Sequence, residues 1–154
     1  MPAFEWIARD HPAFVHVPIA ASLLLPLPLA LSLKRPIWIP AVRLLAWAAF
    51  AGGIVAVLSG LLWARSMDLI AAGAFAPAGT GLIATHEWLA LSGLGVGFAA
   101  LLLIEGKKLR SGLAVALLWA VLWGAAGHWG GRMVFPEPDV ISHTILSTEP
   151  SWAT

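Results

Sequence analysis

The sequence predicts an all-α integral membrane protein, a bundle of four transmembrane helices with both termini on the periplasmic side. Three observations lead to this prediction. Of the 154 residues, 60% are hydrophobic and only 11% are charged, whereas an average soluble domain has about 25% charged residues. Four long apolar segments each approach the roughly 20 residues that a helix needs to cross a hydrocarbon core. The basic residues gather in two of the links between these segments.

The four expected spans fill most of the chain, so residues 1–154 are predicted to form a single domain with a short polar C-terminal tail. Runs this long and this uniformly apolar are typical of helices and are too long for the strands of a membrane barrel. In chain order, the spans are expected at about 13–33, 37–64, 82–104 and 112–135.

The first span is expected to be retained rather than cleaved. Its basic pair, Lys34 and Arg35, follows the apolar run. A signal peptide has its positive charge before that run.

The distribution of Lys and Arg predicts the orientation, because short basic loops stay cytoplasmic. The link between spans one and two contains Lys34 and Arg35, with Arg43 nearby, and the link between spans three and four contains Lys107, Lys108 and Arg110. The opposite side has Arg9, Arg65 and Arg132, which are spread over three segments. Both termini and the loop at 65–81 are therefore expected on the periplasmic side of a bacterial inner (plasma) membrane.

Tryptophan and glycine predict how the spans pack. Three Trp residues lie deep in the spans and are expected between helices: Trp47, Trp119 and Trp123. Small residues let membrane helices approach closely. This role is expected for Gly52, Gly53, Gly93, Gly95 and Gly97.

Several chemistries are excluded by residues that the chain lacks. It has no Cys and no Tyr, which excludes disulfides, thiolate metal sites, covalently attached c-type haem and tyrosyl radicals. Nothing in the sequence resembles a nucleic-acid surface. Ser22, Ser59 and Ser92 are isolated within spans, so no serine nucleophile is predicted. The inner halves of the spans are essentially without ionisable groups, so no transmembrane proton path is predicted.

Histidine placement is the informative chemical feature. His16, His86 and His128 are expected inside the outer ends of spans one, three and four, at similar depth. Ionisable residues in such positions are rare and are candidates for function. His128 is expected to be the deepest. His11, which precedes Pro12, is expected to be mainly an interfacial residue at the start of a span.

Two imidazoles from facing helices can hold a b-type haem. Close approach of the ring would require small residues, and Gly127, Gly130 and Gly131 surround His128. Arg132, one turn outward from His128, could meet a propionate. Asp10 and Glu87 are expected as polar partners of the ligands.

The same histidines allow other interpretations. Three His residues with an open position could instead bind zinc or copper. They could also bind nothing and act as interhelical polar packing, as membrane histidines often do.

Two motifs resemble those of a family of bacterial four-span membrane proteins, classed as a domain of unknown function. Its members open with an HPxxVHFPI-like stretch and close with a GHxGGxLVY-like stretch. The corresponding segments here are residues 11–19, HPAFVHVPI, and residues 127–135, GHWGGRMVF. Val17 and Phe135 depart from the usual Phe and Tyr. The resemblance implies a redox setting beside c-type cytochrome modules, with His16, His86 and His128, and more weakly His11, as haem ligands.

The favoured function is therefore a small b-type cytochrome-like electron-transfer subunit rather than a self-standing enzyme. Its expected partners are the lipid bilayer, other membrane redox subunits or a periplasmic c-type cytochrome, and quinone. One alternative is a non-catalytic structural subunit of a larger redox or photosynthetic membrane complex. Another is a periplasmic-side metal-binding membrane protein.

Overall fold

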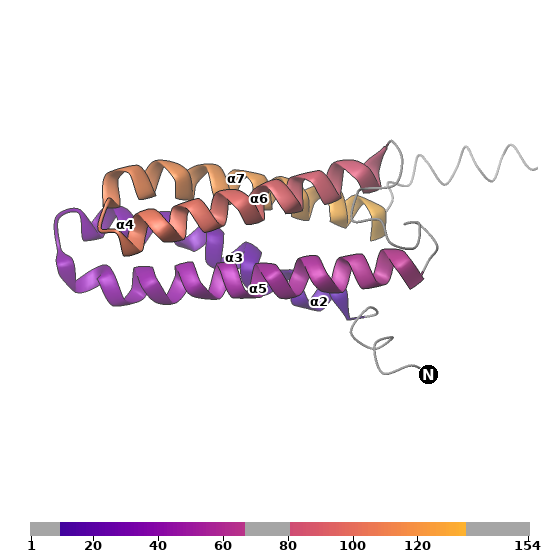
Figure 1. Ribbon diagram of the computed structural model, residues 1–154, viewed down its shortest axis with the longest axis horizontal. Coiled ribbons are helices and arrows are strands. Elements are labelled where there is room, and N and C mark those ends of the chain that lie inside the picture. Colours follow the sequence, from indigo (N-terminus) through magenta and orange to yellow (C-terminus); the bar gives the residue numbers. More distant parts are fainter. Residues whose placement is uncertain (1–9, 67–80, 135–154) are drawn as a thin grey trace, which may run out of the picture.

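A computed structural model describes residues 10–66 and 81–134. This part of the chain is helical and contains no strand. Figure 1 shows long helices lying side by side along one axis. Those long and apolar enough to cross a membrane are His11–Ser32, Pro36–Arg65, Leu82–Glu105 and Leu109–Met133. The prediction of a four-span all-helical membrane protein is confirmed at this level.

The first span is interrupted by prolines and comprises α2 (His11–Phe14), α3 (His16–Leu24) and α4 (Pro26–Ser32). Proline has no N–H to donate to the preceding turn, which locally breaks the helical hydrogen-bond series. The linking residues Val15 and Leu25 keep right-handed helical dihedral angles. The three pieces therefore follow one another as one bent span.

The remaining spans are continuous helices. A short 3-10 turn, η1 (Pro36–Trp38), leads into α5 (Ile39–Ser66), which is followed by α6 (Leu82–Glu105) and α7 (Leu109–Val134). The first span begins at His11, two residues before the expected position, so His11 lies within the helical region rather than ahead of it. The C-terminal tail lies outside the described residues.

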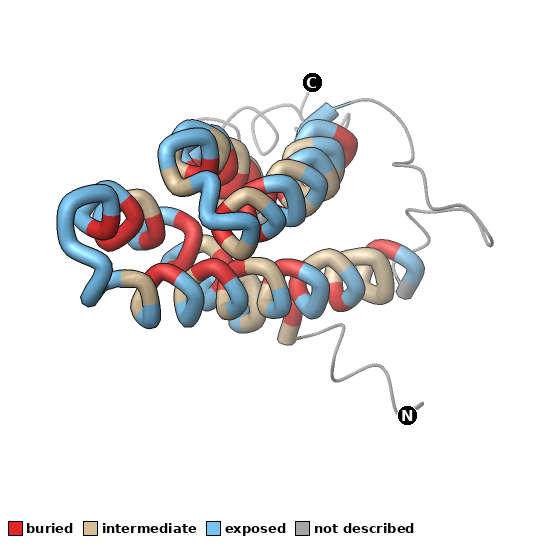
Figure 2. Tube along the Cα trace, turned by 60° about the vertical axis from the view of Figure 1, so that its left-hand side comes forward, coloured by how far each residue is buried: buried red, intermediate tan, exposed pale blue. Residues whose placement is uncertain are grey.

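The spans form a closed four-sided arrangement. Contacts join α3 to α5, α5 to α6, α6 to α7, and α7 back to α3. Figure 2 shows buried positions turned inward along each helix and exposed positions turned outward. The outward positions are apolar along most of the helices, which is expected where the neighbouring phase is lipid.

Two tryptophans of α7 fill the centre of the bundle. Trp119 is fully buried and Trp123 is 3% exposed. On α6, a Cβ added at Gly97 would overlap the Trp119 ring, and one added at Gly93 would overlap the Trp123 ring. Trp123 also reaches α5, where a Cβ at Gly53 would lie 2.7 Å from its Cη2. The indoles thus occupy space that glycine leaves free.

The expectation for two other residues was wrong. Trp47 is 51% exposed rather than packed in the core. Its indole N–H donates a hydrogen bond to Glu105 Oε1 at 3.3 Å. Gly95 faces no atom within 4 Å and so makes no close helix contact.

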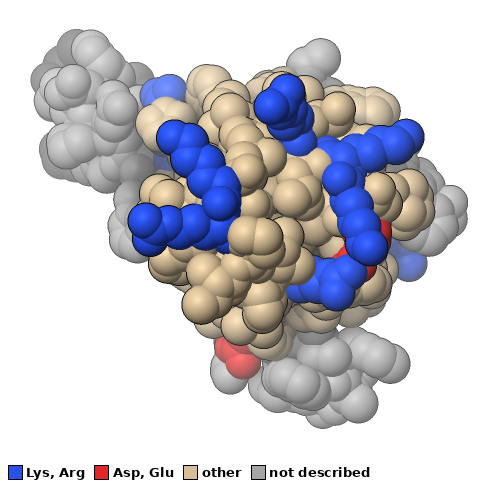
Figure 3. All heavy atoms as spheres, turned by 90° about the vertical axis from the view of Figure 1, so that its left-hand side faces the viewer, with Lys and Arg blue, Asp and Glu red and all other residues tan. Residues whose placement is uncertain are grey.

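The two ends of the bundle differ in charge. The links after α4 and after α6 lie at the same end (Figure 1), and the lysines and arginines gathered there are visible in Figure 3. That basic end contains Lys34, Arg35, Arg43, Lys107, Lys108 and Arg110. The other end holds the start of α2, the end of α5, the start of α6 and the end of α7 (Figure 1). We call it the histidine end, because His11 and His86 lie there.

Candidate functional site

His11 is the first residue of α2 and is only 8% exposed. Its Nδ1 lies 2.9 Å from the hydroxyl oxygen of Ser59 on α5. That hydroxyl donates its one proton to the carbonyl oxygen of Ala56 at 3.0 Å. It therefore accepts a hydrogen bond from His11 rather than donating one to it. Nδ1 of His11 therefore carries the proton, and the lone pair of the neutral ring is on Nε2.

His86, on the first turns of α6, is held in the same way. Its Nδ1 lies 2.8 Å from the backbone carbonyl oxygen of Ala126 on α7. A carbonyl oxygen only accepts, so Nδ1 of His86 donates and carries a proton. In the neutral ring, the lone pair is again on Nε2. Both tautomers are thus assigned from hydrogen-bond partners.

The two imidazoles lie next to each other, edge to face, at the histidine end. Their ring centroids are 6.4 Å apart, with an angle of 79° between the planes. On its other side, His11 stacks on Trp63 of α5, with centroids 6.1 Å apart and an interplanar angle of 26°. Helices α2, α5, α6 and α7 each contribute a group to this arrangement.

Glycine makes room for each ring. A Cβ added at Gly60 of α5 would lie 2.9 Å from Cε1 of His11. One added at Gly130 of α7 would lie 3.0 Å from Cε1 of His86. Both distances are shorter than a methyl group tolerates without a shift, so an alanine at either position would push on an imidazole.

The other two expected ligands lie elsewhere. His16 and His128 are both exposed on the outside of the bundle. His128 contacts the ring of Trp129, with centroids 5.8 Å apart. His11 lies at the start of the first span, as expected, but its side chain is buried between helices. His128 lies further inside its helix than His11 or His86, but its side chain faces outward. Helical rotation explains this, because residue 128 lies about 200° around α7 from both Ala126 and Gly130 at about 100° per residue.

The residues expected around His128 have separate surroundings. Gly127 faces Ile19 of α3, whose Cδ1 would lie 2.9 Å from an added Cβ. A Cβ added at Gly131 would have no atom of the described residues within 4 Å. The guanidinium of Arg132 lies 5.3 Å from the centroid of the Trp129 ring. Of the three glycines, Gly130 is the one that the structure brings to an imidazole.

Sequence reasoning missed Ser59 and Trp63, and it expected carboxylates as partners of the ligands. The partners found are the hydroxyl of Ser59 and a backbone carbonyl. Oε2 of Glu87 is buried and has no hydrogen-bond partner among the described residues. The sequence of α5 does carry a sign of this site. Within about one turn of an otherwise apolar helix it has a hydroxyl (Ser59), a residue without a side chain (Gly60) and an aromatic ring (Trp63).

Two imidazole nitrogens are thus available at the histidine end. The described residues contain no group of three or more His, Cys, Asp or Glu side chains arranged to hold a metal ion. A protein-bound zinc ion takes three or four protein ligands. Haem iron takes four nitrogens from the porphyrin and needs only axial ligands from the chain. Two imidazoles are therefore enough protein ligands for haem, whereas a zinc ion would need at least one more.

The chain was compared with protein-family models, curated proteins and solved structures, and none of them matches it.

Proposed function

We propose that the chain is a small b-type cytochrome-like electron-transfer subunit of a bacterial inner membrane, with haem held by His11 and His86. The observation that carries the proposal is a pair of adjacent imidazoles from separate helices, each held through Nδ1, so that Nε2 is the nitrogen left to bind a metal. Such outer hydrogen bonds fix the tautomer and the orientation of metal-binding histidines.

The closeness of the two rings supports the proposal. Their centroids are 6.4 Å apart, so one prosthetic group at the histidine end could be held by both imidazoles. The rings come from separate helices, α2 and α6, which suits a cofactor bound between the helices of a bundle.

Haem bound here would supply a one-electron redox couple. The chain's own part is to hold and orient the ligands through Ser59 and the Ala126 carbonyl, and to cover one of them with Trp63. The basic loops favour a cytoplasmic location for the opposite end, which would put the histidine end on the periplasmic side. A site at one end cannot pass electrons across the whole membrane, so other redox subunits, a periplasmic c-type cytochrome or quinone would complete the path.

The test is haem content and absorption spectrum of the full chain, purified from cells supplied with haem precursor. We expect a Soret band and about one haem per chain by the pyridine haemochrome assay, because the chain brings together one pair of imidazoles. His11→Ala and His86→Ala should each lose most of the haem. The exposed controls His16→Ala and His128→Ala should retain it.

A ligand exchange separates ligation from folding. His86→Met keeps an atom that can bind iron, the thioether sulfur, and Met/His ligation raises the reduction potential of haem. We expect this variant to retain haem at a higher potential than the wild type. A haem-replete preparation with no Soret band would refute the proposal. So would loss of haem in His128→Ala with retention in His11→Ala.

A further inference from the structure

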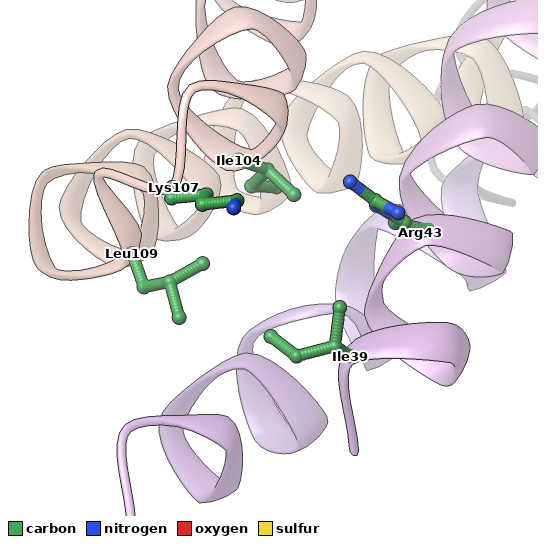
Figure 4. Close-up of a pocket in the computed structure, with 5 residues that line it drawn as sticks. All are labelled: Ile39, Arg43, Ile104, Lys107 and Leu109. Carbon is green, nitrogen blue, oxygen red and sulfur yellow. The ribbon is translucent and has the colours of Figure 1, made fainter. Parts of the chain in front are cut away.

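A cavity of about 270 Å³ opens at the basic end, far from the paired histidines. It lies between the start of α5 and the turn that joins α6 to α7, and it is lined by Ile39, Arg43, Ile104, Lys107 and Leu109. Figure 4 shows Arg43 and Lys107 reaching into this space from opposite sides. The remaining three lining residues are apolar, so the cavity combines an apolar wall with a cationic rim.

We propose that this cavity binds an anionic phospholipid, with the phosphate between Arg43 and Lys107 and the start of an acyl chain along the apolar residues. Both halves of the lining point to a lipid. A free phosphate would use the two cations and leave the apolar wall against water. The volume is below the roughly 300–1,000 Å³ of sites that enclose a whole drug-sized ligand, so it suits the headgroup-proximal part of a lipid whose tails continue into the bilayer.

The depth of the cavity agrees with this occupant. The 24 residues of α6 extend about 36 Å at 1.5 Å per residue. A hydrocarbon core is about 30 Å thick and a bilayer with its headgroups about 40–45 Å. The end of α6, where Ile104 and Lys107 line the cavity, therefore falls at the level where lipid phosphates lie. Basic pockets between membrane helices are known to take such headgroups.

The backbone of Lys107 is a second, independent observation. Lys107 is the one non-glycine residue with positive φ in the described chain, at +59°. Left-handed geometry costs an ordinary residue about 1–2 kcal/mol and is usually assigned to glycine at helix ends. Here Gly106, directly before it, has φ −73°. The position favoured for glycine thus holds a lysine whose side chain faces the cavity. Strained backbone of this kind is found preferentially at functional sites.

The two cations contribute differently. Arg43 NH2 lies 2.9 Å from Glu105 Oε2, which offsets part of its charge. No carboxylate among the described residues forms an ion pair with Lys107. Lys107 should therefore contribute most to phosphate binding, and Glu105 should weaken it.

The experiment is native mass spectrometry of the full chain in detergent, with phosphatidylglycerol and phosphatidylcholine added at equal concentration. We expect the wild type to retain phosphatidylglycerol preferentially. One cation near a lipid phosphate contributes about fivefold in affinity, so Lys107→Gly should lower phosphatidylglycerol affinity about fivefold, and it should not destabilise the fold because glycine relieves the positive φ. Glu105→Gln should raise that affinity.

Controls distinguish the cavity from a diffuse basic surface. Lys34→Gln removes a charge at the same end from a residue that does not line the cavity, and we expect it to change phosphatidylglycerol affinity less than twofold. An equal effect of Lys34→Gln and Lys107→Gly would overturn the proposal, as would equal binding of the two lipids by the wild type. Displacement of the lipid by millimolar inorganic phosphate would also overturn it, since it would show that the apolar wall contributes nothing.

Discussion

Replacing Gly93 by alanine tests how the tryptophans of α7 hold the bundle together. A Cβ at this position would overlap the Trp123 ring. Trp123 is 3% exposed, and Gly53 confines it from α5, so the indole has no open direction in which to move. Overpacking a well-packed core typically costs about 1–3 kcal/mol.

The same substitution also changes helix propensity, so it needs a matched control. Alanine is favoured over glycine inside a helix by up to about 1 kcal/mol. Gly95 lies on the same helix two residues away and faces no atom within 4 Å. Gly95→Ala therefore carries the propensity gain without the overlap. The difference between the two variants isolates the overlap, and we expect Gly93→Ala to be less stable by about 1–3 kcal/mol.

The assay is reversible unfolding in mixed dodecylmaltoside and SDS micelles, followed by far-ultraviolet circular dichroism. The free energy of unfolding is compared among the wild type, Gly93→Ala and Gly95→Ala. Equal stability of the two variants would refute the assignment of Trp123 to a space that glycine leaves open. A Gly95→Ala protein less stable than the wild type would contradict the statement that this face of α6 makes no close contact.

Two further predictions concern the histidine end. Ser59→Ala removes the acceptor of a buried imidazole N–H on His11, which should lower the free energy of unfolding by about 1–3 kcal/mol. Ser22 is equally buried and its hydroxyl bonds within its own helix, so Ser22→Ala should lower the free energy of unfolding by about 1 kcal/mol or less. Equal losses in the two variants would argue against the cross-helix bond. Gly130→Ala should displace the imidazole of His86 and lower haem affinity about tenfold, a typical effect of disturbing the groups that hold a ligand. Gly131→Ala places its methyl group against no described atom and should bind haem as the wild type does. Equal haem affinity of the two variants in a titration would count against His86 as a haem ligand.

The prolines of the first span show what can and cannot be predicted from local sequence. The first span was expected as one segment at 13–33, but it contains Pro18, Pro26 and Pro28, and the helix divides into α2, α3 and α4 where hydrogen bonds are lost. The sequence does not say whether such breaks end a membrane helix or only bend it. Contacts with α5 and α7 along its length keep the span together. One of them is between Pro18 and Gly52, where an added Cβ would lie 3.2 Å from Pro18 Cδ.

The histidines show where sequence reasoning ends. Length and hydropathy place a residue along the bundle axis, because each helical residue advances a fixed distance. They correctly placed His86 near one end of its span. They did not say which histidines turn inward, because the direction of a side chain depends on how each helix is rotated against its neighbours. Rotation is decided by packing, here by indoles seated on glycines of adjacent helices.

The sequence by itself determined the helical class, the four membrane-spanning segments and the gathering of basic residues at two links, because these follow from apolar length and from local charge. The tertiary structure alone decided that His11 and His86 meet while His16 and His128 face outward. It also decided that the hydroxyl of Ser59 and the carbonyl of Ala126 orient them. These pairings join residues about 40–75 positions apart in the chain, and only the mutual rotation and spacing of packed helices brings such groups together.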